Sequence, residues 1–469
     1  MLSAVLKRAG HQTSLLHITS VHYSDEDFRR DLEREAPDLL AVSCTTFAFR
    51  LGAHLARLAK DMRPNLPNIF GGLHPTMSPE EVINTPGIDM LCKGEGEEAI
   101  VELCERLEAG RDHCDVANLW VNYASKTHRN PVRPVEQDLD SYPFADREIF
   151  NYGNLHHEQK GWGTFMMTRG CAFGCTYCAN RTLMHLYRGQ NYVRFRRPEK
   201  VAEEIKTVFA KYPHLHSVHF DDDLPFIKKD YTQEFCDVYK REVHAPFRFN
   251  LRPNLVFEEE LCKLRDAGCT EAKIGLESGN EVIMNRVLDR ALTVQQVEDA
   301  FHTANRAGIK TYSFNMVGLP DETPSAVLET VRLNARAKPY CMQVSIFFPF
   351  PGTPLWDLCK ERGWLSEDVP LDYFSRSTLP LDTMTNAQVL FFHRRFHQLV
   401  RLYQRAYAWY GTGPNNWVVK LLDWTLTFEP TRRLWSWALR FGLPAFRSLR
   451  DRFGHRPQAQ AEYKQYVGM

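Results

Sequence analysis

The sequence lacks an excess of either charge. Its 469 residues include 58 Lys and Arg against 58 Asp and Glu, whereas a general nucleic-acid binder normally carries a basic excess. It also lacks an apolar run near the 18 or so residues that a membrane span needs. Residues 1–10 lack the long apolar segment of a secretory signal peptide. We therefore expect a cytoplasmic protein that has no membrane span and does not bind nucleic acid.

The sequence also lacks a disulfide framework and the paired Cys-x2-Cys motifs of a structural zinc site. Only three of its 12 cysteines cluster, namely Cys171, Cys175 and Cys178. The other nine are scattered singly, at Cys44, Cys92, Cys104, Cys114, Cys236, Cys262, Cys269, Cys341 and Cys359. Scattered cysteines in a cytoplasmic protein are expected to be reduced thiols.

The first third of the chain alternates short apolar runs with amphipathic helical patterns. Strands are predicted at 13–16, 39–43, 68–70 and 90–92, and helices at 26–35, 51–62 and 97–107. This alternation predicts βαβ units and a Rossmann-like parallel sheet over residues 1–111. Because the sequence opens in what should be the first helix, we expect the usual first strand to be missing. Residues 112–161 contain several prolines and are predicted to be an irregular linker.

The middle third has six more strand–helix units, which we assign to a domain over 162–365. The predicted strands are 164–167, 217–220, 247–251, 271–276, 311–317 and 342–347, and the predicted helices are 198–211, 231–243, 258–267, 294–307 and 325–336. A closed barrel of this type needs eight units, so we expect an open, partial (β/α)6 barrel. The fold class is therefore α/β throughout the first two domains.

Residues 366–469 are predicted to form a helical C-terminal region. Helices are expected at 387–410, 416–426, 431–440 and 445–453, and a disordered tail is expected after residue 455. These helices are rich in Trp, Phe and Arg. That composition favours a packed helical cap, and a hydrophobic or lipid-like substrate is the alternative.

The strongest motif follows the first strand of the middle domain. It runs from Thr168 to Cys178 and spaces three cysteines as C-x3-C-x2-C. Thiolates are the ligands of iron–sulfur clusters, and three of them leave one iron of a four-iron cluster open. That iron can bind a cofactor through an amino and a carboxylate group, as S-adenosylmethionine (SAM) offers. Gly170 and Gly174 let the backbone approach the cluster, and Arg169 can offset its negative charge.

This loop and the partial barrel resemble the radical SAM superfamily, and the preceding domain resembles its cobalamin-binding subgroup. The resemblance implies that Cys171, Cys175 and Cys178 hold a [4Fe-4S] cluster. It also implies that the reduced cluster cleaves SAM into methionine and a 5′-deoxyadenosyl radical, which abstracts a substrate hydrogen.

The resemblance places SAM contacts at the ends of successive strands. Asp222 and Asp223 stand where the family holds the SAM amino group, although a helix N-cap cluster is the alternative for them. Arg252, beside Asn250, suits the SAM carboxylate. The remaining SAM-binding residues that the resemblance implies are Tyr177, Asn250, Glu277, Ser278 and Gly318.

Two further segments carry the resemblance. Residues 314–323 resemble the adenine-packing segment of the family, and an ordinary strand-to-helix turn capped by Asp321 or Thr323 is the alternative. Residues 348–354 resemble the segment that follows the sixth strand in this subgroup. The order of these motifs after the cysteine loop is what supports the resemblance.

Three loops at strand ends resemble those of the cobalamin-binding subgroup, at the edge where parallel sheets bind ligands. Their residues are Ser43, Thr45, Gly71, Gly72, His74, Gly94, Glu95 and Gly96. The sequence has no Asp-x-His-x-x-Gly motif, so we expect no histidine on the lower face of the cobalt. A loop histidine that precedes a proline is the alternative interpretation of His74.

These features favour a cobalamin-dependent radical SAM C-methyltransferase. One alternative is a radical SAM cyclase or oxidoreductase that does not use methylcobalamin, and another is an iron–sulfur redox carrier with a degenerate SAM site. The expected partners are a small-molecule substrate, with a hydrophobic molecule as one option, and an electron donor such as flavodoxin or ferredoxin. The sequence identifies no catalytic side chain.

Overall fold

The computed structural model describes residues 1–18, 23–366, 372, 374–413 and 416–441. The chain folds into two compact units. The first unit comprises residues 1–159, 168–204 and 349–358. The second unit comprises the other described residues, from 160–167, 205–348 and 359 onward.

A five-stranded sheet in the order β1-β2-β3-β4-β5 forms the centre of the first unit. Strands β1 (Leu40–Ser43), β2 (Asn68–Gly71) and β3 (Met90–Cys92) are parallel, whereas β4 (Leu119–Tyr123) and β5 (Lys126–Arg129) are antiparallel. The surrounding helices are α1 (Leu2–Arg8), α2 (Asp25–Glu35), α3 (Thr46–Met62), α4 (Leu73–Met77), α5 (Pro79–Ile83) and α6 (Glu97–Glu108). The three parallel strands place their carboxyl ends, and the predicted cofactor loops, at one edge.

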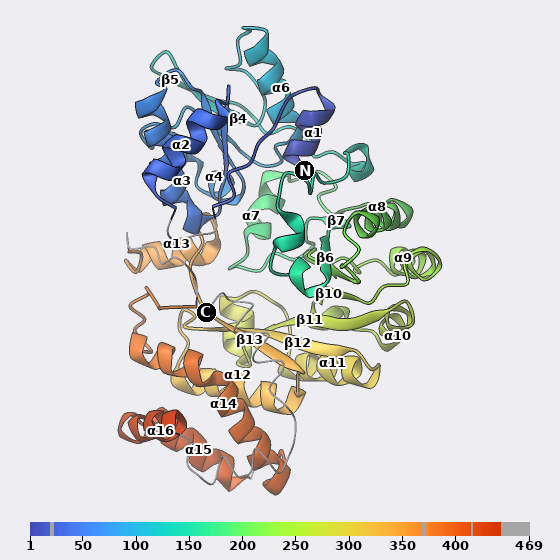
Figure 1. Ribbon diagram of the computed structural model, residues 1–469. Helices are drawn as coiled ribbons and strands as arrows, with labels where there is room; N and C mark the ends of the chain where they lie inside the picture. The colour runs from blue at the N-terminus through green and yellow to red at the C-terminus, as the bar shows by residue number, and fades with distance from the viewer. Residues whose placement is uncertain (19–22, 367–371, 373, 414–415, 442–469) are drawn as a thin grey trace. The chain divides into compact units, whose positions relative to one another are not determined.

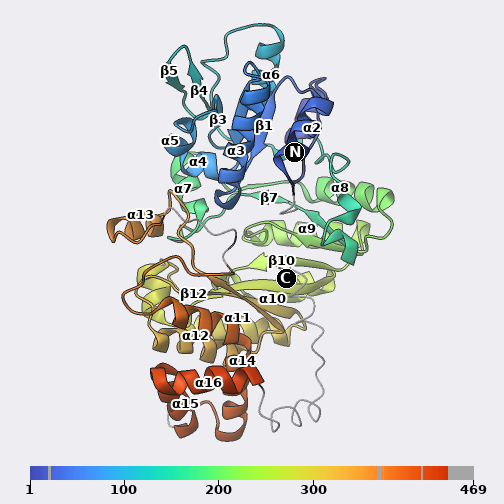
Figure 2. The ribbon, with the colours of Figure 1, turned by 60° about the vertical axis from the view of Figure 1, so that its left-hand side comes forward.

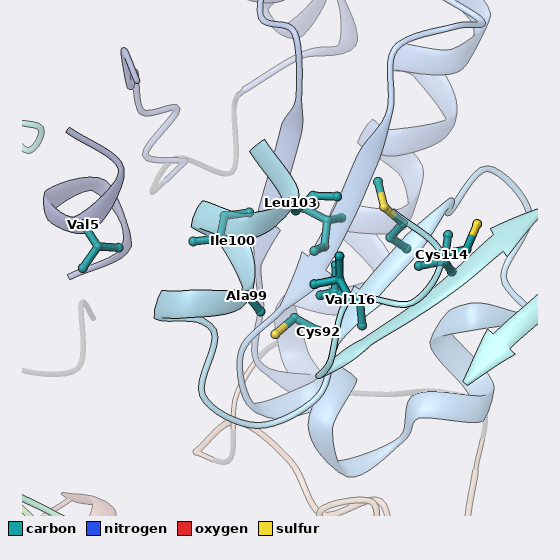
Figure 3. Packing of buried hydrophobic residues seen from close by; sticks show 11 residues of the cluster. Val5, Cys92, Ala99, Ile100, Leu103, Cys114 and Val116 are labelled. Carbon is teal, nitrogen blue, oxygen red and sulfur yellow. The ribbon is translucent and has the colours of Figure 1, made fainter. Parts of the chain in front are cut away.

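The core of this sheet explains two of the isolated cysteines. Cys92 of β3 and Cys114 lie in a buried cluster with Val5, Ile100 and Leu103 (Figure 3). Both cysteines are small apolar groups in this setting. The amphipathic faces of α1 and α6 therefore close one side of the sheet.

Two expectations for this region are wrong. Residues 13–16 form no strand, and the segment that we expected to be an irregular linker contains the β4–β5 hairpin. The hairpin turns at Ala124 and Ser125, which have φ of 50° and 61°. Two successive positive φ values define a type I′ turn, which usually contains Asn or Gly. An Ala-Ser turn carries no such signal, so the hairpin could not be recognised from the sequence.

The second unit contains a six-stranded parallel sheet in the order β13-β12-β11-β10-β9-β6. Its strands are β6 (Trp162–Phe165), β9 (Ser217–Phe220), β10 (Phe247–Leu251), β11 (Cys269–Glu277), β12 (Lys310–Val317) and β13 (Cys341–Ile346). All six predicted strands are present, and the sheet ends at β6 and β13 as an open barrel does.

Helices α9 (Lys229–Glu242), α10 (Glu258–Asp266), α11 (Val294–Arg306) and α12 (Pro324–Ala337) cover one face of this sheet (Figure 1). Buried aromatic rings fill the space between them and the strands. Phe220 packs edge to face on Phe235 and Phe247, and Tyr239 contacts the same group. Alternation along the strands therefore directs the polar residues of β9 and β10 to the opposite face.

Three predicted C-terminal helices are present as α14 (Asn386–Tyr410), α15 (Trp417–Thr427) and α16 (Glu429–Phe441) (Figure 2). The α14 side chains His393 and His397 hydrogen-bond the β13 carbonyl oxygens of Val344 and Met342 at 3.1 and 2.9 Å. Helix α14 thus covers the edge strand of the sheet. The fourth predicted helix and the predicted disordered tail lie outside the described residues. Among the described helices, none is long and apolar enough to cross a membrane.

Candidate functional site

The cysteine loop connects the short strand β7 (Thr168–Arg169) to helix α7 (Ala179–Leu186) in the first unit. Gly170 begins the loop with φ of +90°, and a Cβ atom there would lie 2.6 Å from the carbonyl oxygen of Tyr192. Only glycine fits both the conformation and the space. Cys171 and Cys175 are 9% and 8% exposed, and Cys178 is half-buried.

Cys178 occupies the N-cap of α7. The side-chain Nδ2 of Asn180 donates to the Cys178 sulfur at 3.7 Å, and the Tyr192 hydroxyl donates to the Asn180 side-chain oxygen at 2.9 Å. A helix N-terminus and an N–H donor both favour a negative thiolate. The loop therefore offers an environment suited to the anionic cluster that the spacing predicts.

Burial raises the pKa of most cysteines outside the loop. Desolvation raises the pKa of Cys44, Cys92 and Cys236 to about 12 and that of Cys104, Cys114 and Cys359 to about 11, so these thiols stay protonated at neutral pH. In the described part of the chain, no three His, Cys, Asp or Glu side chains converge on a single metal ion. A cubane does not need such convergence, because each cysteine binds a different iron.

Two ion pairs join the cysteine loop to the loop after β3, within the first unit. Arg169 donates to Glu97 at 2.5 Å. Arg194 of strand β8 (Arg194–Phe195), which pairs with β7, is 2% exposed and forms a bidentate pair with Glu95. The Glu97 carboxylate therefore neutralises the charge of Arg169. The Glu95 carboxylate, which is among the predicted cobalamin contacts, is already paired with the Arg194 guanidinium.

A hollow of about 170 Å³ lies at the carboxyl ends of β2 and β3. Gly72 and Gly94 line it with φ of +91° and +87°. The Tyr187 hydroxyl accepts a hydrogen bond from the Glu95 backbone amide at 2.8 Å. A Cβ atom on Gly94 would lie only 2.1 Å from that hydroxyl oxygen. The other lining residues are Leu73, Thr76, Leu183 and Tyr192. Glycines and aromatic rings at this edge fit the apolar rim of a corrin, although the hollow holds only part of one.

The remaining predicted cobalamin contacts divide by exposure. Ser43 and Thr45 are exposed at the end of β1, while Gly71 and Gly96 are half-buried beside the hollow residues. His74 is 2% exposed, packs on the Phe49 ring at 4.3 Å and has its pKa lowered by burial. His74 lies in helix α4 rather than in a loop, and its contact with cobalamin stays a prediction.

The predicted SAM contacts lie at the strand ends of the second unit. The Asp222 carboxylate is fully buried and accepts from the Met167 amide at 2.9 Å. The Asn250 side chain donates to the Asp222 carbonyl oxygen at 2.7 Å. Asp222 thus fixes the ends of β6, β9 and β10 relative to one another. Asp223 is exposed, and Tyr177 is half-buried in the cysteine loop of the first unit.

Arg290 connects two other predicted contacts and was not recognised in the sequence. Its guanidinium donates to the carbonyl oxygens of Gly275 and Leu276 at 2.7 and 3.1 Å and lies 3.8 Å from the Glu277 carboxylate. The Arg252 guanidinium donates to the Arg290 carbonyl oxygen. Ser278 is fully buried beside this group. No motif surrounds Arg290, so only the folded chain reveals its role.

The turn after β12 contains Gly318, a predicted SAM contact, and a buried glutamate, Glu322, that was not expected from the sequence. Gly318 has φ of +80°, and its amide donates to the Glu322 carboxyl at 2.7 Å. Glu322 is fully buried, and desolvation raises its pKa to about 8. Thr323 caps α12 through the Ala326 amide. Thr323 therefore caps α12, as the alternative interpretation of residues 314–323 predicted for it.

A second unrecognised group lies on the polar face of the same sheet. Arg248 donates to the His219 Nδ1 atom at 2.6 Å, and the Lys273 ammonium lies 3.4 Å from the same ring. Burial lowers the pKa of Lys273 to about 7 and that of His219 to about 4. The Asp221 carboxylate lies 3.0 Å from His219 Nε2. His219, Arg248 and Lys273 thus form a buried polar group on β9, β10 and β11, the strands that carry predicted SAM contacts at their ends, and Asp221 lies at its exposed edge.

A partial barrel with a three-cysteine loop, preceded by a parallel-sheet domain, defines a class of iron–sulfur enzyme. Comparison with protein families identifies this class of enzyme. Residues 165–333 match the radical SAM superfamily, and residues 1–104 match the B12 binding domain. The chain therefore contains a radical SAM domain and a B12-binding domain. Its cofactors are accordingly a [4Fe-4S] cluster, SAM and cobalamin.

Several proteins resemble this chain over most of its length. An uncharacterized methyltransferase of Pyrococcus horikoshii is 26% identical over 76% of this chain and 76% of its own length. The anaerobic magnesium-protoporphyrin IX monomethyl ester cyclase of Cereibacter sphaeroides is 26% identical over 88% of this chain and 68% of its own. The radical SAM methyltransferase TsrM from Kitasatospora setae shares the fold, with a TM-score of 0.65 and 18% identity over 78% of this chain and 73% of that one.

Proposed function

We propose that this chain is a cobalamin-dependent radical SAM methyltransferase that acts on a carbon of a small-molecule substrate. The observation that carries the proposal is the joining of the cysteine loop and the B12-domain loop in one compact unit. Arg169 and Arg194 on either side of the cysteine loop pair with Glu97 and Glu95. A methyltransferase among the relatives supports the same reaction type.

In this proposal Cys171, Cys175 and Cys178 hold the cluster, and the residues around the hollow hold the corrin. The bound cluster supplies the electron that cleaves SAM, and the bound cobalamin supplies the methyl group. The chain itself orients these groups. The N-terminus of α7 and Asn180 stabilise negative charge at Cys178, and burial of Cys171 and Cys175 limits the access of water to their sulfur atoms.

The second unit would hold SAM through the ends of its strands. The buried Asp222 is fixed by Met167 and Asn250, so the exposed carboxylate of the adjacent Asp223 can be presented to the SAM amino group without rearrangement of the strands. Arg252 and Glu277 are both tied to Arg290. Such prior ordering reduces the entropy that substrate binding costs.

A radical SAM cyclase is the second candidate. The cyclase relative aligns with more of this chain, 88%, than the methyltransferase relative does, at the same identity. Both reactions begin with the same SAM cleavage. They differ in whether a SAM-derived methyl group leaves the enzyme on the product.

The test is an anaerobic reconstitution of the full chain with iron, sulfide and hydroxocobalamin, followed by reduction with dithionite in the presence of SAM labelled in its methyl group. We expect 5′-deoxyadenosine and, separately, transfer of label to the bound corrin together with S-adenosylhomocysteine. Deoxyadenosine without any labelled corrin would favour the cyclase. Neither product, from protein that carries a full cluster, would favour an iron–sulfur carrier.

The matched control compares two triple variants. Replacing Cys171, Cys175 and Cys178 with Ala should abolish iron binding and both products. Replacing Cys104, Cys262 and Cys341, the three other cysteines that are only half-buried, should leave both unchanged. A cluster retained in the first variant would contradict the assignment.

The proposal includes a cytoplasmic location and a small electron-transfer protein, flavodoxin or ferredoxin, as the physiological reductant. Free cysteines throughout the described residues fit a reducing compartment. Replacement of dithionite by reduced flavodoxin in the same assay tests the partner.

A further inference from the structure

The C-terminal helices leave a continuous apolar surface in solvent. On α15, Trp417, Leu421 and Trp424 are 61%, 49% and 59% exposed, and Phe428 at its C-cap is 51% exposed. Their spacing of four, three and four residues places them on one side of the helix. The surface continues to the end of α14, because the Tyr410 ring lies 5.8 Å from that of Trp417. We call these five residues the aromatic face.

The other side of α15 is already packed. Val419, Leu422 and Leu426 are buried against the neighbouring helices α12 and α14. Asp423, on the flank, pairs with Arg332 and accepts from the Tyr403 hydroxyl. Helix α15 thus has two apolar sides, and a helix of this kind usually packs against a partner on each side. Within the described residues only one of those sides is covered.

Charge identifies the kind of partner. From residue 386 to the end, the sequence contains 13 Lys and Arg but only 4 Asp and Glu. Residues 1–385 contain the other 45 basic and 54 acidic residues. A neutral protein therefore has a net positive charge in this region and a net negative charge over the rest of the sequence. Lys420 is exposed between Trp417 and Leu421, while Asp423 is neutralised by Arg332. A basic region with exposed Trp and Tyr is characteristic of proteins that lie on anionic membrane surfaces.

We propose that the aromatic face docks on the surface of an anionic phospholipid bilayer. Indole and phenol rings favour the boundary between headgroups and acyl chains, where their apolar bodies are buried and their polar ends stay hydrated. The 11 residues of α15 are too few to span a bilayer, which takes about 20, so the helix lies in the plane of the interface.

The same charges disfavour two other occupants. A second copy of the chain would bring two basic regions together. The chain's own residues 442–469 contain five Lys and Arg against two acids, so they match the charge of the face rather than complement it. An anionic lipid surface satisfies both the apolar and the basic groups.

The experiment is flotation of the full chain with vesicles of phosphatidylcholine alone, or of phosphatidylcholine mixed with phosphatidylglycerol. We expect flotation with the anionic vesicles. Raising the salt from about 0.1 M to about 1 M shortens the Debye length from about 10 Å to about 3 Å and should weaken it. The triple variant Trp417→Ser, Leu421→Ser, Trp424→Ser should lower the partition coefficient by about tenfold or more, because three large side chains no longer enter the interface.

The matched control is Tyr123→Ser, Phe257→Ser, Tyr340→Ser, which removes three rings of similar exposure, 58%, 46% and 50%, from other surfaces. It should float like the wild type, and Trp417→Phe, Trp424→Phe should retain most of the binding. Equal melting temperatures would show that each variant is folded. Flotation that is absent, is equal for both lipids or is unaffected in the Ser variant would overturn the proposal. A concentration-dependent dimer abolished by that variant would assign the face to a second copy instead.

Discussion

Gly170 and Gly174 each precede a cysteine of the loop, yet the backbone makes different demands at the two positions. Gly170 has φ of +90°, and a Cβ there meets a backbone oxygen at 2.6 Å, whereas the nearest atom to a Cβ on Gly174 is 3.8 Å away on a flexible side chain. We predict that Gly170→Ala strongly reduces the iron bound per chain after anaerobic reconstitution. Gly174→Ala should bind iron as the wild type does.

The difference between these two variants tests the loop conformation itself. Left-handed backbone alone costs an alanine about 1–2 kcal/mol, and the overlap with the Tyr192 carbonyl adds to that cost. Equal iron contents in the two variants would show that the loop adopts another conformation when it holds its cluster.

Glu322 predicts a dependence of stability on pH. Burial raises its pKa from 4.5 to about 8, so between these values the folded chain holds a proton that the unfolded chain has released. Stability therefore falls as pH rises through this window, by at most about 1.4 kcal/mol per pH unit. Above about pH 8 the contribution is constant, because both states are ionised.

The substitution Glu322→Gln tests this prediction, because glutamine keeps an oxygen for the Gly318 and Leu319 amides and cannot ionise. Urea unfolding midpoints of the apoprotein at pH 5 and pH 8 are the measurement. We expect the variant to gain stability relative to the wild type at pH 8 and to lose this advantage at pH 5. A constant difference between the two proteins at both values would contradict a protonated Glu322.

At the scale of elements, apolar periodicity predicted much of the fold. The strands β3, β9 and β10 were predicted with the bounds that the structure has, and β13 was displaced by one residue. These strands are buried apolar runs, for which pattern is a strong signal. The short elements were missed, including α7 and the β4–β5 hairpin, because their turns and caps use residues with no special propensity.

The candidate site could be located from the sequence only in part, and the roles of its residues stay predictions. Cysteine spacing alone selected the loop, because thiolates have few other uses in such a pattern. The residues that hold the loop and the strand ends in place were not recognised. Arg194, Arg290 and Lys273 are buried basic side chains whose partners lie on other elements. A single sequence contains no record of such pairings, so only the folded chain can reveal them.

The pair between Arg194 and Glu95 joins two elements, the β7–β8 ladder and the loop after β3. The Arg194 side chain is 1% exposed and that of Glu95 is 22% exposed. Removal of one member of a buried ion pair leaves the other charge uncompensated, which costs about 3–5 kcal/mol. We predict that Glu95→Gln lowers the melting temperature of the corrin-free protein.

Glu98→Gln is the control, because the Glu98 side chain is 53% exposed and lies 3.5 Å from Arg133. An exposed pair of this kind contributes no more than about 1 kcal/mol. Similar melting temperatures for the two variants would mean that Arg194 finds a compensating partner, and that the two elements are joined by other contacts.

At the scale of the whole molecule, the proposed chemistry is divided between the two units. The cysteine loop, which includes Tyr177, and the hollow belong to the first, whereas the other predicted SAM contacts belong to the second. Cobalamin retention and SAM cleavage should therefore respond to different substitutions. The hollow offers a way to affect the first alone, because Leu73 lines it while remaining 39% exposed.

We predict that Leu73→Trp fills the hollow and abolishes the retention of hydroxocobalamin after desalting, while 5′-deoxyadenosine is still formed from SAM. Leu51→Trp makes the same change at a side chain that is 45% exposed on α3 and does not line the hollow, so it should retain the corrin. Absorbance of the bound corrin and chromatography of the nucleoside give the two readouts. Retention of the corrin by both variants would place its binding elsewhere than the ends of β2 and β3. Loss of deoxyadenosine together with the corrin in Leu73→Trp would show that SAM cleavage depends on an intact cobalamin site, and that the two functions are not separable.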